Sequence, residues 1–364
     1  MLAATLLCFR RLGLVSRNYA GVLGCGVALI CGATQSGLAG ADEPATETAT
    51  LEAPVAKGQE AAAAESRTAS APNVSELVWH AEYATARESA KKNRRMLLIL
   101  FTDAIDAEVR RSFLGSLEQD PDVRALLERY ERAWLTRKSS VRIGADDVPL
   151  LEHNSFRDML GRCGLAVVDF RDPQNRFYHQ VVSVYPFGAH DPPQLGNNAS
   201  PPQVGPAEAG RASPMGPWIS LDEFSVLLDL PEGSLTQRTL IFAVRTHPDN
   251  PASASGEASE LLMSEAESHS RHQADLRVQG HHNWGSRFQR ITNLLPGNLL
   301  AQEVCAESWP GQPLLDAARE CVRSWRQSDG HWDAVQRRHR LFGYDMKAGA
   351  NGVWYATGIF GRNR

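Results

Sequence analysis

A run of six consecutive apolar residues, MLLILF at 96–101, directly follows the polar segment KKNRR. A strand that is buried on both faces has this pattern, whereas a strand with one face in water alternates apolar and polar residues. Helical spacing precedes the run, because Trp79, Tyr83, Ala86 and Ala90 lie three or four residues apart. The sequence therefore predicts helices packed on a sheet, which is an α/β fold.

The N-terminal part has the features of an export signal followed by a tether. Three arginines precede an apolar run at 19–33, and an A-x-A sequence follows it at 39–41. We interpret 1–41 as a secretory signal peptide, since the run is short for a membrane span. A retained N-terminal membrane anchor is the main alternative, and lipid attachment at Cys25 is a third. Residues 42–74 hold almost no large apolar side chains, which predicts a disordered tether.

Gly and Pro divide the remaining chain into two blocks. Residues 188–217 contain 12 Gly or Pro among 30 positions, which predicts a loop within a first block at 75–230. A second block spans 235–364. The net charge of −4 and the scattered basic residues give no general attraction to nucleic acid. We expect a protein of the periplasm, the cell surface or the medium, with no membrane span once the signal is removed.

The first block resembles the thioredoxin-like fold. VWHAEYATARESAKKNRRMLLILF is similar to the entry helix and central strand of that fold, and GLAVVDFRDPQNRFYHQVV to its later hairpin. The family carries a Cys-x-x-Cys redox pair after the central strand, where a helix N-terminus lowers the pKa of a thiol. FTDAIDAEV occupies that place here and holds no cysteine, and Gly164 stands where the family has a proline. The resemblance therefore implies a redox-inactive domain.

The second block contains long helical patterns and a terminal hairpin. In ASELLMSEAESHSRHQADLRVQG, His269 shares the inward stripe with Leu262, so we expect a buried, hydrogen-bonded histidine. The helix PLLDAARECVRSW is expected to run into QSDG and to end at Gly330 in the left-handed conformation, which would fix His331 just beyond it. Ala-Asn-Gly at 350–352 predicts a turn between two strands.

Four motifs in order resemble the CAP superfamily of cysteine-rich secretory proteins, venom antigens, plant pathogenesis-related proteins and many exported bacterial proteins. They are AESHSRHQADLRVQGHHNW, AQEVCA, WRQSDGH and NGVWYATGIFG. The resemblance covers about 235–361. It implies a three-layer α-β-α sandwich with a cleft in which two histidines and one or two glutamates converge.

The resemblance also implies the residues of that cleft. The first histidine is His281, with His282 as a close rival, and the glutamate is Glu303, with a slip of one residue to Gln302 left open. The second histidine is His331. Ser328 takes the place of a second glutamate that eukaryotic members carry, which removes one carboxylate.

Two imidazoles and one carboxylate can hold Zn²⁺ and leave a coordination position open. Alternatively, the glutamate orients the histidines by hydrogen bonding, and the histidines titrate near neutral pH. No nucleophile is paired with a base, so the sequence favours binding over covalent catalysis.

We therefore expect an exported binding protein. Its ligand is a small molecule, a cell-wall component, a protein or a metal ion. A metal-dependent hydrolase of peptides or esters that uses His281, Glu303 and His331 is one alternative, and a structural interaction module is another. Four tryptophans are expected to pack around the cleft: Trp284, Trp309, Trp325 and Trp332.

Cysteine usage does not indicate a disulfide scaffold. Cys163, Cys305 and Cys321 remain after the signal peptide, and three thiols cannot all pair within one chain. A Cys305–Cys321 bridge and buried free thiols are both consistent with the sequence.

Overall fold

The computed structural model describes residues 77–103, 114–115, 117, 119–188 and 219–363. The predicted signal peptide, the tether and nearly all of the 188–217 loop lie outside these residues. The described part belongs to one compact unit, Ala71–Arg364. Two four-stranded sheets organise it, and no helix of the described residues is long and apolar enough to cross a membrane.

The first sheet has the strand order β2-β1-β5-β6. Its strands and the elements around them are α1 (Tyr83–Asn93), β1 (Met96–Thr102), α3 (Pro121–Leu127), β2 (Tyr130–Thr136), β3 (Ser140–Ile143), β4 (Asp146–Pro149), the 3-10 helices η1 (Leu150–Glu152) and η2 (Asn154–Met159), β5 (Gly164–Val168), β6 (Val181–Pro186) and α4 (Leu221–Leu228). β1 pairs with β2 in parallel and with β5 antiparallel, and β5 pairs antiparallel with β6. Every residue of β1 is buried, as the apolar run predicts.

The second sheet has the order β7-β9-β10-β8. This part comprises α5 (Leu235–Arg245), β7 (Glu257–Ala258), α6 (Glu260–Leu276), α7 (Trp284–Leu294), β8 (Leu299–Glu307), α8 (Leu314–Arg326), α9 (Asp329–Gln336), β9 (Leu341–Ala348) and β10 (Trp354–Asn363). β10 pairs antiparallel with both β8 and β9, so the predicted terminal hairpin is confirmed. β8 is an edge strand of the sheet.

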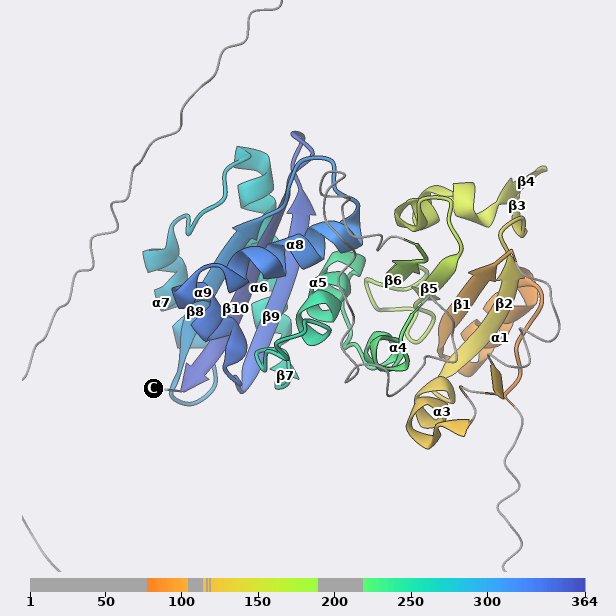
Figure 1. Cartoon of the computed structure of the whole chain (residues 1–364), viewed down its shortest axis with the longest axis horizontal. Helices are drawn as coiled ribbons and strands as arrows, with labels where there is room; N and C mark the ends of the chain where they lie inside the picture. The colour runs from red at the N-terminus through yellow and green to blue at the C-terminus, as the bar shows by residue number, and fades with distance from the viewer. Residues whose placement is uncertain (1–76, 104–113, 116, 118, 189–218, 364) are drawn as a thin grey trace, which may run out of the picture. The chain divides into compact units, whose positions relative to one another are not determined.

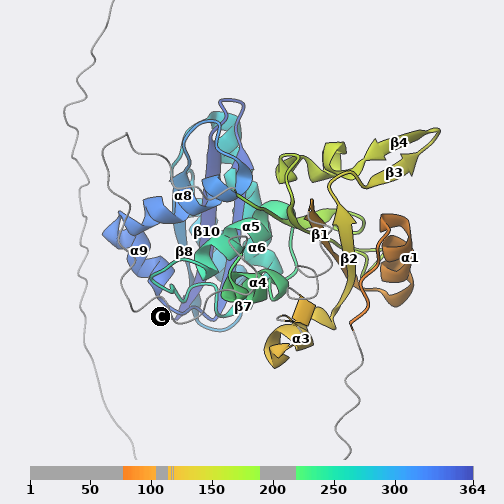
Figure 2. The same cartoon turned by 45° about the vertical axis from the view of Figure 1, so that its right-hand side comes forward.

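Helices cover both faces of the second sheet (Figures 1 and 2). α5 and α8 contact each other on one face, and α6 packs across β9 and β10 on the other. α7 and α9 both contact the edge strand β8. The α/β class is confirmed, while the thioredoxin-like and CAP assignments stay predictions.

α6 lies unusually close to β9 because a glycine faces it. A Cβ atom on Gly343 would lie 2.2 Å from the backbone carbon of Leu262 and 2.3 Å from the backbone nitrogen of Met263. Real Cβ atoms do not approach backbone this closely, so the contact depends on the missing side chain. It fixes the height of α6 above the sheet and therefore the position of His269, two turns further along that helix.

The expected helix end at Gly330 is wrong. α8 ends at Arg326, and Gly330 and His331 lie inside the next helix, α9. Ser328 is the residue before α9, and Asp329 stands in its first turn, where an acidic side chain is stabilised by the positive end of the helix dipole. The Ser-Asp-Gly sequence is therefore a helix start, and the backbone of Gly330 has no need of the left-handed conformation.

Candidate metal centre

A buried carboxylate lies at the centre of the candidate site. The strand β8 alternates, so that Val304 and Ala306 join the core on the side of α8, while Glu303 and Cys305 face the opposite way. Glu303 lies in the middle of β8 opposite Ile359, and its side chain has no solvent exposure. An isolated buried carboxylate is costly, so its partners define the site.

Three cationic or titratable side chains surround Glu303. An Nη atom of Arg287 lies 2.6 Å from Oε2, and Nδ1 of His281 lies 3.0 Å from Oε1. Nε2 of His269 lies 3.7 Å from Oε1. Arg287 comes from the first turn of α7, His281 from the connection before it, and His269 from α6.

These contacts determine the charge of Glu303. Burial alone would raise its pKa, but the hydrogen bond from His281, the ion pair with Arg287 and the nearby charges outweigh that effect and lower the pKa. Glu303 is therefore an anion in the folded protein. Because a carboxylate only accepts hydrogen bonds, Nδ1 of His281 carries the proton that it donates to Glu303.

His331 completes the cluster from the other side of the edge strand. It is the third residue of α9, and its Nε2 lies 3.4 Å from Nε2 of His281. Burial, and then the charge of His281, lower the pKa of His331, which favours its neutral form. The side chain of His281 is 41% exposed, so the pair of Nε2 atoms can be reached from solvent.

The structure thus brings together three of the residues that the sequence selected, His281, Glu303 and His331. It also decides between the two neighbouring histidines. His282 points elsewhere, since its Nε2 hydrogen-bonds to the carbonyl oxygen of Val278. Its ring lies 6.0 Å from the ring of His269.

Ser328 is the residue that directly precedes α9. Its backbone N–H donates to the carbonyl oxygen of Trp325, and its side chain makes no capping hydrogen bond. No hydrogen bond of its side chain to His281, Glu303 or His331 occurs among the described residues. Its role in a cleft stays a prediction.

His269 is buried, as predicted, and has a second role that helical spacing did not show. Its Nε2 lies 2.9 Å from the carbonyl oxygen of Gly280. A carbonyl only accepts, so this nitrogen carries a proton. Burial lowers the pKa of His269 to about 4, against the opposing effect of the Glu303 charge.

His269, Glu303 and Cys305 form a group whose ligand atoms all lie within 4.8 Å of one another, a spacing at which they could hold a metal ion. Two features weaken this set. The Nε2 atom of His269 is occupied by its bond to Gly280. Burial, and then the Glu303 charge, raise the pKa of the Cys305 thiol well above its usual value, which disfavours the thiolate that metals bind. The exposed His281–His331 pair is the better-prepared site.

Sequence reasoning missed Arg287 and Cys305. Trp284, Phe288 and Ile291 recur at helical spacing and could have located α7, and with it an arginine facing the sheet. Cys305 follows Glu303 by two residues, so strand alternation places both side chains on one face.

The remaining predictions for this block have mixed outcomes. Cys163, Cys305 and Cys321 are free thiols, so no Cys305–Cys321 bridge is present. Trp325 and Trp332 are buried, but Trp309 is 63% exposed and does not pack as expected.

Comparison with known proteins adds little. No protein-family model and no curated protein matches the chain. Among solved structures, an outer surface protein from Borrelia burgdorferi is similar at 18% sequence identity, over 30% of this chain and 78% of that one, with a TM-score of 0.25. A likeness at that TM-score does not establish a shared fold.

Proposed function

We propose that this chain binds a divalent transition metal ion, with Zn²⁺ as the best fit, through Nε2 of His281 and Nε2 of His331. The separation of these atoms, 3.4 Å, carries the proposal. Two nitrogens that each lie about 2.0–2.1 Å from a tetrahedral Zn²⁺ are about 3.3–3.4 Å apart. The two nitrogens therefore already stand at the spacing that a shared ion requires, and Nε2 of His331 gives up the proton of its contact with His281 when the ion binds.

Glu303 supports this role without being a ligand. By accepting a hydrogen bond from Nδ1 of His281, it fixes the tautomer of the ring and leaves the lone pair on Nε2. Arg287 holds the carboxylate in turn through an ion pair at 2.6 Å. This is the orienting role that the sequence left open for Glu303.

The geometry favours binding over hydrolysis. A hydrolase of this kind needs a general base within reach of a metal-bound water. Glu303 has no solvent exposure and is already bonded to His281 and Arg287. With two protein ligands, the ion keeps open positions for a further donor. We therefore propose that an exported binding protein presents the ion to a ligand: a small molecule, a cell-wall component or another protein.

Calorimetry with Zn²⁺ on chelator-treated full-length protein at about pH 7 tests the proposal. We expect one equivalent to bind, and binding to be lost in His281→Ala and in His331→Ala. Glu303→Gln keeps an acceptor but no charge, so the affinity should fall about 10–100-fold. His282→Ala is the matched control, because it removes an adjacent imidazole that faces away, and it should bind like the wild type. No uptake by the wild type would refute the metal site.

A further inference from the structure

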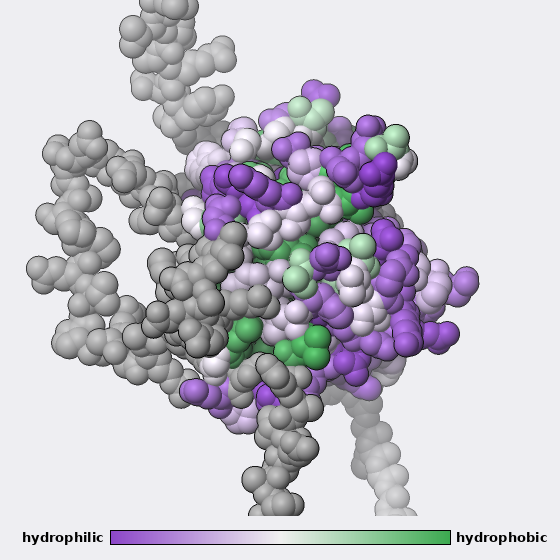
Figure 3. Space-filling view, turned by 90° about the vertical axis from the view of Figure 1, so that its right-hand side faces the viewer, coloured by the Kyte–Doolittle hydropathy of each residue, from purple (hydrophilic) through white to green (hydrophobic). Residues whose placement is uncertain are grey.

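A separate cavity lies on the first sheet, far in the fold from the histidine pair, and the proposed function uses none of its residues. It has a volume of ≈ 200 Å³ and is bordered by α1, the β3–β4 hairpin, the 3-10 helices and the ends of β5 and β6. The hairpin projects beyond the sheet in both cartoon views (Figures 1 and 2). On the side of the molecule shown in Figure 3, apolar patches interrupt a mainly hydrophilic surface.

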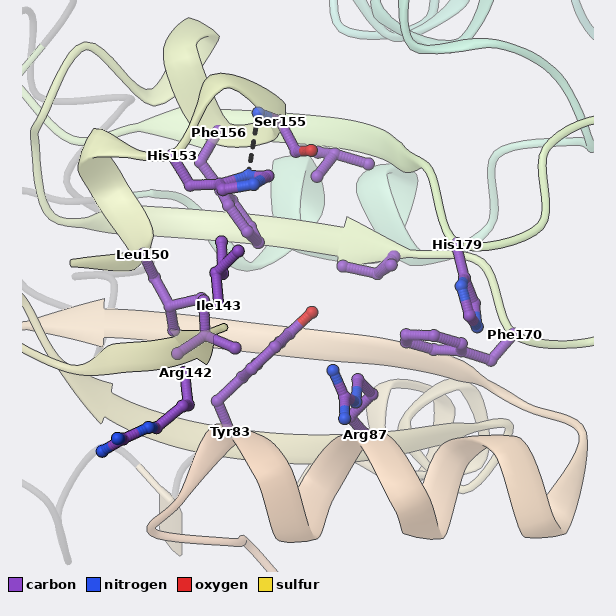
Figure 4. A pocket seen from close by; sticks show the side chains of 13 residues that line it. Tyr83, Arg87, Arg142, Ile143, Leu150, His153, Ser155, Phe156, Phe170 and His179 are labelled. Atoms are coloured by element: carbon purple, nitrogen blue, oxygen red, sulfur yellow. Dashed lines mark hydrogen bonds between the residues drawn. The ribbon is translucent and has the colours of Figure 1, made fainter. Parts of the chain in front are cut away.

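Apolar side chains form the interior of this cavity (Figure 4). They include Leu150, Phe156, Val168, Phe170 and Val181. All five are buried, and they come from four separate segments of the chain. Such an interior favours the apolar part of a ligand, since moving apolar surface out of water is favourable.

Two polar groups of α1 point into the cavity from successive turns, Tyr83 and Arg87 (Figure 4). Among the described residues, the hydroxyl of Tyr83 has no hydrogen-bond partner. Burial raises the pKa of Tyr83, so the hydroxyl keeps its proton at neutral pH and can donate. Arg87 places a permanent positive charge beside it.

A third donor faces them from the opposite wall. Nδ1 of His153 accepts a hydrogen bond from the backbone N–H of Ser155 at 3.2 Å (Figure 4). In neutral imidazole the other nitrogen then carries the proton, so Nε2 of His153 is a donor. No Asp or Glu of the described residues lines the cavity, and Arg142, which is also 3.8 Å from Asp147, adds a second guanidinium at its rim. Tyr83, Arg87 and His153 thus offer two donors and a cation, which a carboxylate matches.

Arg87 is free to exchange partners. Its Nε lies 3.2 Å from Glu88, but both side chains are exposed, and ion pairs of this kind contribute little. A carboxylate inside the cavity would meet the guanidinium in a less hydrated setting and would add the Tyr83 hydroxyl. Such a ligand competes well with Glu88.

The backbone at the far wall is strained. His179 has a φ of 65°, which is uncommon for a residue with a side chain. Its ring lies 5.1 Å from the ring of Phe170, where it closes one end of the cavity (Figure 4). Strain of this kind is concentrated at ligand sites, where the surrounding structure holds it. Burial, and then the positive charges of Lys91 and Arg87, lower the pKa of His179, so the ring is neutral at neutral pH.

We propose that this cavity binds a small aromatic carboxylate, with the carboxylate at Arg87 and the Tyr83 hydroxyl and the ring against Phe156 and Phe170. The size fits, because an apolar cavity of about 150 Å³ accepts benzene. The ≈ 200 Å³ here leaves room for one ring and one carboxylate. A neutral ring of the same shape lacks the charge that Arg87 recognises.

Benzoate and its uncharged analogue benzamide are the probes for this site. Calorimetry or ligand-observed NMR on the full chain should show saturable benzoate binding, with benzamide at least about tenfold weaker. Arg87→Gln should weaken benzoate by about tenfold or more and leave benzamide unchanged, so that the preference between the two probes disappears. Tyr83→Phe removes only the hydroxyl and should weaken benzoate by less than Arg87→Gln.

Arg95→Gln is the matched control. Arg95 follows α1, is similarly exposed, lies 3.9 Å from Glu131 and does not line the cavity. It should bind benzoate like the wild type. No saturable binding of benzoate by the wild type, equal binding of benzamide, or an equal loss in Arg95→Gln would each overturn the proposal. The His281→Ala and His331→Ala variants should keep benzoate binding, so a failure of this site is distinguishable from a failure of the metal site.

Discussion

Glu303 shows how a single residue organises its surroundings. A carboxylate without solvent contact must be compensated, and removing one partner of a buried ion pair costs about 3–5 kcal/mol. Arg287 supplies the permanent charge, and His281 supplies a hydrogen bond. The pKa of Glu303 is lowered, so its contribution to stability is present above the pKa of an unfolded glutamate and is lost as the pH falls through the folded value.

His269 makes the stability of the protein depend on pH in a higher pH range than Glu303 does. Its pKa is near 6.5 in an unfolded chain and about 4 in the folded protein, so between these values the unfolded state binds more protons. Stability is therefore undiminished above the unfolded pKa and falls as the pH drops toward 4. From about pH 7 to about pH 5 we expect a loss of about 2 kcal/mol from this residue.

Chemical unfolding of the wild type and of His269→Gln at these two pH values measures the effect. Glutamine can still donate to the carbonyl oxygen of Gly280 but does not titrate. The free energy of unfolding of the variant should therefore change less with pH. Equal changes in the two proteins would contradict the depressed pKa.

At the scale of elements, the position of α6 depends on the close approach of its backbone to Gly343 of β9. Gly343→Ala places a methyl group against the backbone at Leu262 and Met263, which cannot retreat as the end of a flexible side chain can. We expect the free energy of unfolding to fall by about 1–3 kcal/mol, the usual cost of overpacking. Because α6 carries His269, the shift should also weaken Zn²⁺ binding. Calorimetry and denaturant titration measure the two effects.

Gly285→Ala is the control for that substitution. Gly285 lies in the first turn of α7, and an added Cβ atom would meet nothing within 4 Å. Alanine is also the better helix former. The variant should be as stable as the wild type or slightly more stable, and a loss equal to that of Gly343→Ala would contradict the packing argument.

The elements also show what the sequence can and cannot reveal. β1 and the terminal hairpin follow from an uninterrupted apolar run and from an Asn-Gly turn, which are local signals. α9 was missed because Ser-Asp-Gly is typical of both a helix end and a helix start. α7 begins after Asn283 in the left-handed conformation without a side-chain cap, so the usual start signal is absent.

The candidate site was predictable only in part, for a similar reason. His281, Glu303 and His331 came from motif spacing. The cavity on the first sheet had no such signal, because its walls come from five segments that only the fold brings together. Arg87 looks like an ordinary surface residue of an amphipathic helix, and Tyr83 like a member of its apolar stripe, until the opposite wall is known.

For the whole molecule, a buried arginine joins the two sheets. Arg238 of α5 donates to the hydroxyl of Ser183 in β6 at 2.7 Å and to the carbonyl oxygens of Leu230 and Pro231 at 2.8 and 2.7 Å. Its side chain is fully buried. Breaking such an arrangement leaves a charge and several acceptors without partners, so neither part can unfold without a penalty to the other.

We therefore expect a single cooperative unfolding transition for the folded part of the chain. Far-ultraviolet circular dichroism and tryptophan fluorescence should give coincident denaturation curves. Tryptophans occur in both parts, at Trp79 and Trp134 in the first and at Trp325 in the second. Two separated transitions would instead support independent domains at 75–230 and 235–364.

The absence of a side chain at Gly343 has a use in tracing the ancestry of this chain. Any descendant of the same ancestor that keeps α6 resting on β9 must keep glycine at the equivalent position, however far its other residues have drifted. Gly256 is similar, since a Cβ atom there would lie 2.1 Å from the carbonyl oxygen of His339. These two glycines are 87 positions apart, and both can be used to align distantly related sequences whose overall identity is low.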